Sequence, residues 1–76
     1  MARQEISIES DFITLGQVLK NEGIIATGGQ AKWFLSEEKV LVNQEQETRR
    51  GRKLYPGDQV TIPALYFDAL MVADEA

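Results

Sequence analysis

Residues 14–30 read TLGQVLKNEGIIATGGQ, and this stretch contains the pattern Thr-x-x-Gln twice. In such a capping box the Thr hydroxyl accepts a hydrogen bond from the third amide of a helix, and the Gln side chain reaches back to the amide of the Thr. The two boxes therefore predict one helix that starts at Thr14 and a second that starts at Thr27. Gly23 ends the first helix, because glycine readily takes the left-handed conformation. The short connector between the two predicts a compact helix-turn-helix unit.

Short strands are predicted on either side of this unit. Ile6 and Ile8 alternate with polar residues, which is typical of a half-buried strand, and we place this strand at a sheet edge. After the helices, residues 40–42 and 46–48 predict a hairpin, and residues 60–62 predict a further strand. The chain is therefore expected to fold as α+β, with two short helices packed on a small, largely antiparallel sheet.

The segment after Ile62 has no pattern that assigns it. Residues 64–72 are apolar enough to need a partner surface, but their periodicity does not choose between helix and strand. We therefore divide the chain into a single domain over residues 1–62 and a C-terminal extension over residues 63–76. Trp33 projects from the far side of the second helix, and we expect it to lie beneath this extension; stacking on an unpaired base is the alternative.

The composition disfavours catalysis. The 76 residues include no cysteine and no histidine, so the commonest metal ligands and the usual proton shuttle are missing. The carboxylates, among them Glu45 and Glu47, form no catalytic constellation and are expected to face solvent. We expect no enzymatic activity, no metal, no cofactor and no small-molecule substrate. The longest apolar run is only a few residues, so we expect a cytoplasmic protein with no membrane contact.

A basic cluster contrasts with the acidic character of the chain. Four of the eight basic residues, Arg49, Arg50, Arg52 and Lys53, fall within five positions, although the net charge is -4. Three guanidinium groups and one ammonium can grip successive phosphates. The cluster alone is equally compatible with a solvated turn whose acidic neighbours pair with it. Any binding of nucleic acid must depend on this local patch, because the total charge does not attract a polyanion.

The start of the second helix is a weaker candidate for an anion site. Gly28 and Gly29 leave the first amides of the helix unobstructed, and Lys32 lies about one turn further on. Taken alone, however, this tetrapeptide is more simply explained by Thr27 as a cap and by the glycines as a tight turn.

In their order along the chain, these features resemble the RNA-binding domain named after small-subunit ribosomal protein S4. The resemblance is carried by residues 12–17 (FITLGQ), 27–32 (TGGQAK) and 49–58 (RRGRKLYPGD), and within that family the chain looks like the short, free-standing bacterial YaaA-like group. It implies binding of structured RNA, often ribosomal RNA, by the second helix start, the hairpin and the basic loop. The contact residues that it implies are Thr27, Gly28, Gly29, Gln30, Lys32, Arg49, Arg50, Arg52 and Lys53.

Two positions depart from the family pattern. Gly28 stands where the family commonly has an arginine, which makes the basic cluster more important. Asn43-Gln44 stands where the family commonly has Asn-Gly, which predicts a looser hairpin turn or one of another type.

We therefore expect a non-catalytic domain that binds ribosomal RNA, with a role at the ribosome or in its assembly and a ribosomal or other protein as a further partner. The first alternative is a protein-interaction module that docks through residues 64–72. The second is a small DNA-binding helix-turn-helix domain, which the acidic pair Glu37-Glu38 disfavours.

Overall fold

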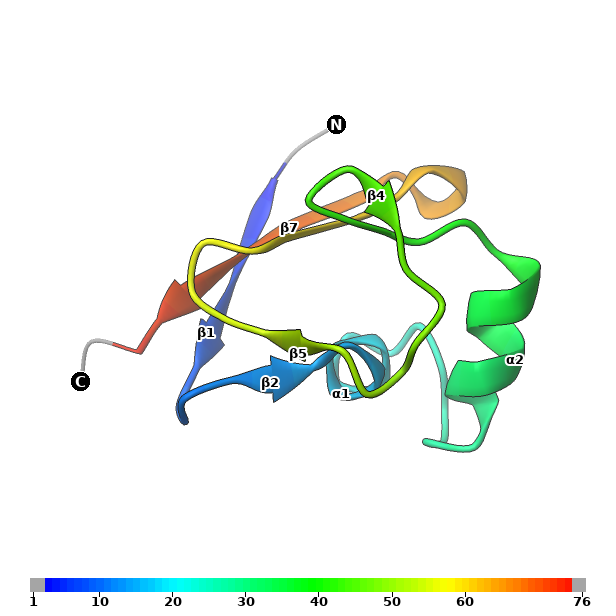
Figure 1. The fold of residues 1–76 in the computed structure, drawn as a ribbon, viewed down its shortest axis with the longest axis horizontal. Helices are drawn as coiled ribbons and strands as arrows, with labels where there is room; N and C mark the ends of the chain where they lie inside the picture. Colours follow the sequence, from blue (N-terminus) through cyan, green and yellow to red (C-terminus); the bar gives the residue numbers. More distant parts are fainter. Residues whose placement is uncertain (1–2, 75–76) are drawn as a thin grey trace.

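The computed structural model describes residues 3–74. Along these residues the elements are β1 (Gln4–Ile8), β2 (Ile13–Thr14), α1 (Leu15–Asn21), α2 (Gln30–Glu37), β3 (Leu41–Val42), β4 (Glu45–Gln46), β5 (Lys53–Leu54), β6 (Gln59–Ile62), the 3-10 helix η1 (Pro63–Leu65) and β7 (Phe67–Ala73) (Figure 1). The predicted α+β class with two short helices is confirmed.

The strands form one main sheet and one small ribbon. The main sheet has the order β1-β7-β6-β3-β4, and a separate two-stranded sheet joins β2 to β5. All pairs are antiparallel except β1 with β7, which run parallel. The sheet is therefore largely antiparallel, and β1 lies at its edge as predicted.

The segment that the sequence left unassigned is a strand inside the main sheet. β7 hydrogen-bonds to β1 on one side and to β6 on the other, and its Ala69 and Met71 side chains are completely buried. A partner therefore cannot dock on residues 67–73 by adding a strand, because both edges of β7 are already paired. The turn before it leaves Leu65 and Tyr66 exposed.

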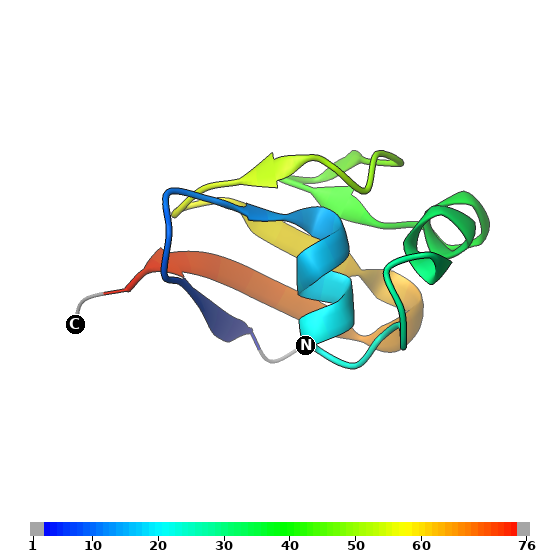
Figure 2. The ribbon, with the colours of Figure 1, turned by 90° about the horizontal axis from the view of Figure 1, so that it is seen from below.

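The two helices supply one side of the core. Leu15, Val18 and Leu19 of α1 have no exposed surface, because their spacing puts them on one face of the helix. α2 buries Ala31, Phe34 and Leu35 in the same cluster. Figure 2 shows α1 running beside the strands and α2 at one end of the molecule.

Both hydrogen bonds of the first capping box form as predicted. The Thr14 hydroxyl accepts a hydrogen bond from the Gln17 amide at 3.3 Å, and the Thr14 amide donates to Gln17 Oε1 at 3.0 Å. The box fixes the direction in which α1 leaves strand β2. The first turn of the helix therefore lies against residues 50–52.

The hairpin turn is tight although it lacks glycine. Asn43 and Gln44 have φ values of 53° and 71°, as a two-residue type I′ turn requires. Asn43 is held in this conformation by a hydrogen bond from its Nδ2 to Asp58 and by one from the Gln59 amide to its Oδ1, each 3.0 Å long. The turn is thus as tight as the Asn-Gly form, because hydrogen bonds between Asn43 and residues distant in the chain stabilise it.

Candidate functional site

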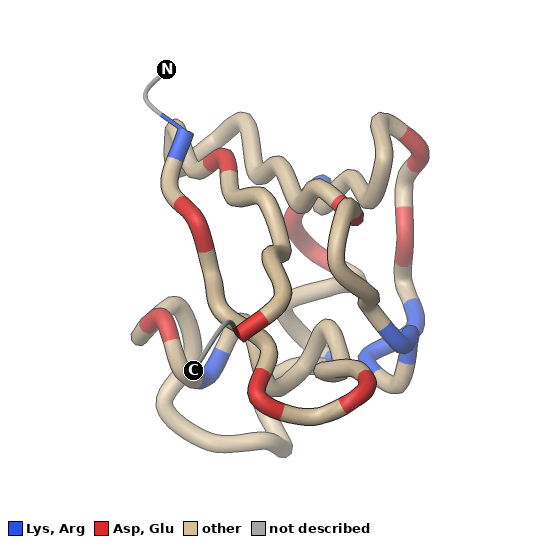
Figure 3. Tube along the Cα trace, turned by 90° about the vertical axis from the view of Figure 1, so that its left-hand side faces the viewer, with Lys and Arg blue, Asp and Glu red and all other residues tan. Residues whose placement is uncertain are grey.

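The basic loop, residues 48–53, is fastened to the start of α1 through its backbone. The amide of Gly16 donates to the Arg50 carbonyl oxygen and the amide of Leu15 donates to that of Arg52, each at 2.9 Å. Glycine permits this approach, since a Cβ at Gly16 would lie 3.3 Å from the Arg50 carbonyl oxygen. The loop therefore has a defined conformation. Figure 3 shows one group of Lys and Arg positions at its right-hand side, with single basic positions elsewhere and Asp and Glu positions spread over the chain.

Glu47 organises this loop from inside. Its carboxylate accepts hydrogen bonds from Arg49 Nε at 3.0 Å, from Arg49 Nη2 at 3.1 Å and from Arg52 Nη1 at 2.8 Å. The amides of Thr48 and Arg49 also donate to it, at 3.1 Å each. Glu47 is only 7% exposed, so the expectation that it faces solvent is wrong. These donors replace water around the buried charge.

The protonation of Glu47 reflects this environment. The hydrogen bonds from the Arg49 side chain, together with those from its backbone and from Arg52, lower the pKa of Glu47 to about 2 against the opposing effect of burial. The carboxylate is therefore ionised at neutral pH and holds both guanidinium groups. In turn, the Glu47 carboxylate raises the pKa of Arg49.

The other two basic side chains contact different parts of the molecule. Arg50 Nη1 lies 3.4 Å from the carbonyl oxygen of Gly28, a long hydrogen bond that joins the basic loop to the start of α2. Lys53 Nζ lies 4.8 Å from the centroid of the Phe12 ring, within the range of a cation–π contact. Among residues 3–74, neither cation has a carboxylate within ion-pair distance.

The start of α2 differs from the prediction. The helix begins at Gln30 with Gly29 as its N-cap, and no side chain caps it. Gln30 Oε1 accepts from the amides of Ala26 at 2.7 Å and Thr27 at 3.3 Å, which is the glutamine half of the predicted capping box. The Thr27 half does not form, because the two glycines add a turn in which the Thr27 carbonyl, not its hydroxyl, accepts from the Gln30 amide at 3.1 Å.

Two residues of α2 are exposed on the surface of the molecule. Lys32 is exposed, and within residues 3–74 it makes neither an ion pair nor a side-chain hydrogen bond. Trp33 is 66% exposed, so the expectation that it packs beneath the C-terminal segment is wrong. The reason is topological, since β7 lies between β1 and β6 and does not reach over α2.

An open hollow of about 380 Å³ lies where the basic loop, α1 and the start of α2 meet. Its lining is formed by Thr14, Gly16, Gln17, Lys20, Gly28, Ala31, Arg50 and Gly51. We call it the glycine hollow. The residue that the sequence analysis does not identify is Lys20, which lines this hollow from α1. The signal was available in part, because Gly16 and Lys20 are four residues apart and share one helix face.

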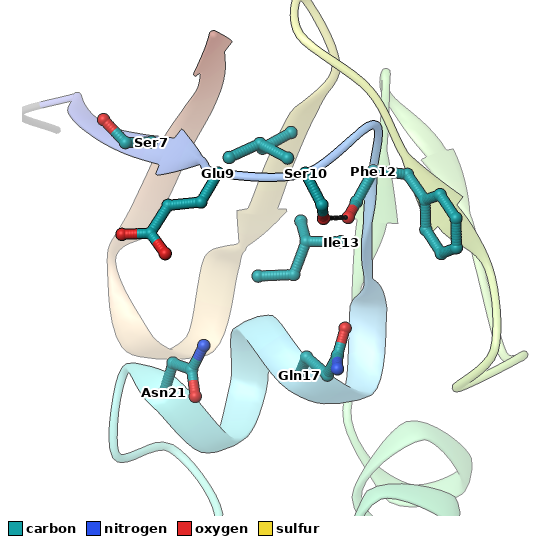
Figure 4. Close-up of a pocket in the computed structure, with 8 residues that line it drawn as sticks. Ser7, Glu9, Ser10, Phe12, Ile13, Gln17 and Asn21 are labelled. Atoms are coloured by element: carbon teal, nitrogen blue, oxygen red, sulfur yellow. Dashed lines mark hydrogen bonds between the residues drawn. The ribbon is translucent and has the colours of Figure 1, made fainter. Parts of the chain in front are cut away.

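A second hollow, of about 370 Å³, is chemically different (Figure 4). It lies between the end of β1 and α1 and is lined by Ser7, Ile8, Glu9, Ser10, Phe12, Ile13, Gln17 and Asn21. This lining carries the Glu9 carboxylate and no cation, so it would repel a phosphate. Only the glycine hollow combines with the basic loop into one positively charged surface.

Residues 3–74 contain neither a metal-binding cluster nor a membrane-spanning helix. No group of three His, Cys, Asp or Glu side chains in this range could hold a metal ion. Neither helix in this range is long and apolar enough to cross a bilayer.

Comparison with known proteins places these features in a family. A family model described as the S4 domain matches residues 6–67, which include both helices, the basic loop and the glycine hollow. The chain is also 63% identical, over 57 residues, to the probable ribosome maturation protein RlbA of Bacillus subtilis (strain 168). That alignment covers 75% of this chain and 80% of the relative. No solved structure is significantly similar.

Proposed function

This chain belongs to the S4 domain family, and on that premise we propose that it binds structured RNA and catalyses no reaction. The observation that carries the proposal is the basic loop. In a chain of net charge -4, Arg50 and Lys53 present positive charge that no carboxylate neutralises within the described residues, on a backbone fastened to α1. Contacts to phosphates would position the RNA, while RNA shape and unpaired bases would supply selectivity.

We further infer that the RNA is ribosomal and that the protein acts in the cytoplasm during ribosome assembly. The support is the similarity to RlbA, which is named as a probable ribosome maturation protein. A ribosomal protein next to the bound RNA would be a second partner. The proposed contact residues remain Thr27, Gly28, Gly29, Gln30, Lys32, Arg49, Arg50, Arg52 and Lys53.

These residues would have different roles. Arg50 and Lys53 are proposed as direct phosphate contacts. Arg49 could serve twice, because its side chain is 74% exposed although it binds Glu47. Arg52 is mostly a support for the loop, since its side chain is 35% exposed and donates to the same carboxylate.

The salt dependence of RNA binding tests this proposal. We would measure retention of purified bacterial ribosomal RNA at increasing salt for the wild type and for the double variant Arg50→Ala/Lys53→Ala. Each phosphate contact that is lost should lower the log–log salt slope by about 0.7 to 0.9. The double variant Arg3→Ala/Lys39→Ala removes the same charge from other segments and should keep the wild-type slope.

Two results would overturn the proposal. One is a wild-type protein that shows no salt-dependent retention of the RNA. The other is equal slopes for the loop variant and its charge-matched control, which would mean that RNA responds to total charge and not to this surface.

A further inference from the structure

We propose that the glycine hollow is a subsite for one unpaired nucleotide of the bound RNA, an inference that rests on the proposed function. The phosphate of this nucleotide would lie between Lys20 and Arg50, and its sugar and base would lie over the glycine-lined floor. The volume of about 380 Å³ falls within the range of about 300 to 1,000 Å³ that small-molecule pockets occupy.

The charge of the lining points to an anionic ligand. Acidic residues outnumber basic ones by twelve to eight in the chain, yet the lining includes Lys20 and Arg50 and no carboxylate. Arg50 is also tied to the start of α2 by its hydrogen bond to the Gly28 carbonyl oxygen. A phosphate that entered here would meet one cation from α1 and one from the basic loop.

The glycines of the lining leave space that the fold itself does not need. Gly16 has a packing reason, because a Cβ there would press against the Arg50 carbonyl oxygen. At Gly28 and Gly51 an added Cβ would meet nothing within 4 Å, and neither residue has the positive φ that requires glycine. Their missing side chains keep the floor of the hollow open to a flat ligand.

A nucleotide fits this combination better than a bare phosphate does. The glycine backbones and the aliphatic stems of Lys20 and Arg50 offer apolar surface beside the two charges. A guanidinium plane such as that of Arg50 can stack on a base, and only an unpaired base is free to leave its helix for such a contact. The hollow should therefore favour an RNA loop or bulge over a continuous duplex.

The experiment fills the hollow without changing its charge. We would compare Gly28→Leu and Gly51→Leu with Ala26→Leu, a nearby control at an exposed residue that neither lines the hollow nor belongs to the proposed contact residues. The two probes are an RNA stem–loop and a fully paired RNA duplex with the same number of phosphates. Thermal unfolding checks that each variant is folded, and two independent hollow variants keep the test decisive if one fails to fold.

We expect both hollow variants to bind the stem–loop about tenfold more weakly than the wild type, the size of one lost base contact. Their affinity for the duplex and their salt slope should not change, because no cation is removed. Lys20→Ala should instead lower the salt slope for the stem–loop by about 0.7, and Lys39→Ala should not.

The outcomes separate this inference from the proposed function. If the wild type binds the stem–loop and the hollow variants bind it equally well, the nucleotide subsite is wrong and RNA binding stands. Equal weakening on both probes would also overturn the subsite, since a duplex presents no unpaired base. If the wild type binds neither RNA, the proposed function itself fails.

Discussion

The four basic side chains of the basic loop form two pairs, which contact different kinds of partner. Arg49 and Arg52 donate to the buried carboxylate of Glu47, whereas Arg50 and Lys53 contact the Gly28 carbonyl oxygen and the Phe12 ring. All four lie within five positions of the sequence. Proximity along the chain therefore does not make them equivalent, and their contribution to binding should not be counted as four equal charges.

The difference indicates why a carboxylate sits inside a positively charged loop. Glu47 cancels part of the local charge, but it also orders the loop before any ligand arrives. A preorganised loop pays less conformational entropy on binding than a flexible one does. In this arrangement one pair of cations maintains the shape, and the other pair is the one that we propose to meet the phosphates.

Replacing Glu47 should have the largest effect, because both supporting arginines then lose their partner. Glu47→Ala leaves two arginines and two amides without their acceptor, and we expect it to lower the free energy of unfolding by about 3 kcal/mol, measured by urea denaturation at neutral pH. Glu47→Gln keeps the shape and one good acceptor, so it should lose less. If Glu47→Ala unfolds at the wild-type urea midpoint, the carboxylate does not organise the loop.

Acid should produce the same loss gradually. The pKa of Glu47 is about 2 in the folded protein and 4.5 as its ordinary value, so its contribution to stability is complete above pH 4.5 and is lost as the pH falls towards 2. A shift of this size corresponds to about 3 kcal/mol. Urea midpoints of the wild type should therefore fall steeply across this window.

Glu47→Gln provides the matched control for the acid experiment. Its urea midpoint should fall less steeply between pH 4.5 and 2 than that of the wild type. A residual slope is expected from Asp68, whose pKa is lowered mainly by the hydrogen bond from the Gln59 side chain. Identical pH profiles for the variant and the wild type would contradict the assignment of the low pKa to Glu47.

Features that depend on neighbouring residues could be predicted from the sequence. The first capping box joins Thr14 to Gln17, three residues away, and the structure contains both of its hydrogen bonds. The second box has the same pattern but forms only the Gln30 half, because Gly28 and Gly29 allow an extra turn before the helix. Local patterns thus locate a helix, while the backbone freedom of glycine decides where it begins.

Features that depend on distant contacts could not be predicted. The burial of Glu47 is decided by which side of the loop its carboxylate faces, and the glycine hollow forms between segments that are far apart in the sequence and are joined by contacts such as that of Gly16 with Arg50. The sequence does not predict strand β7 for a related reason. As an inner strand it has partly covered residues on both faces, so the alternation of a half-exposed strand is blurred.

The smallest predicted effects distinguish the two pairs of cations most directly. Arg52→Ala removes a 2.8 Å hydrogen bond to a buried carboxylate and should lower the free energy of unfolding by about 1.5 kcal/mol. Arg50→Ala should change it by no more than about 0.5 kcal/mol, because its side-chain hydrogen bond is long and exposed.

RNA binding should reverse this order. Arg50→Ala is expected to reduce the salt slope by about one phosphate contact while stability stays near that of the wild type. Arg52→Ala should keep more of the slope, provided that it is measured well below its unfolding temperature. If both variants lost stability and salt slope in equal proportion, the loop would act as one undivided charge and the distinction between supporting and contacting arginines would be wrong.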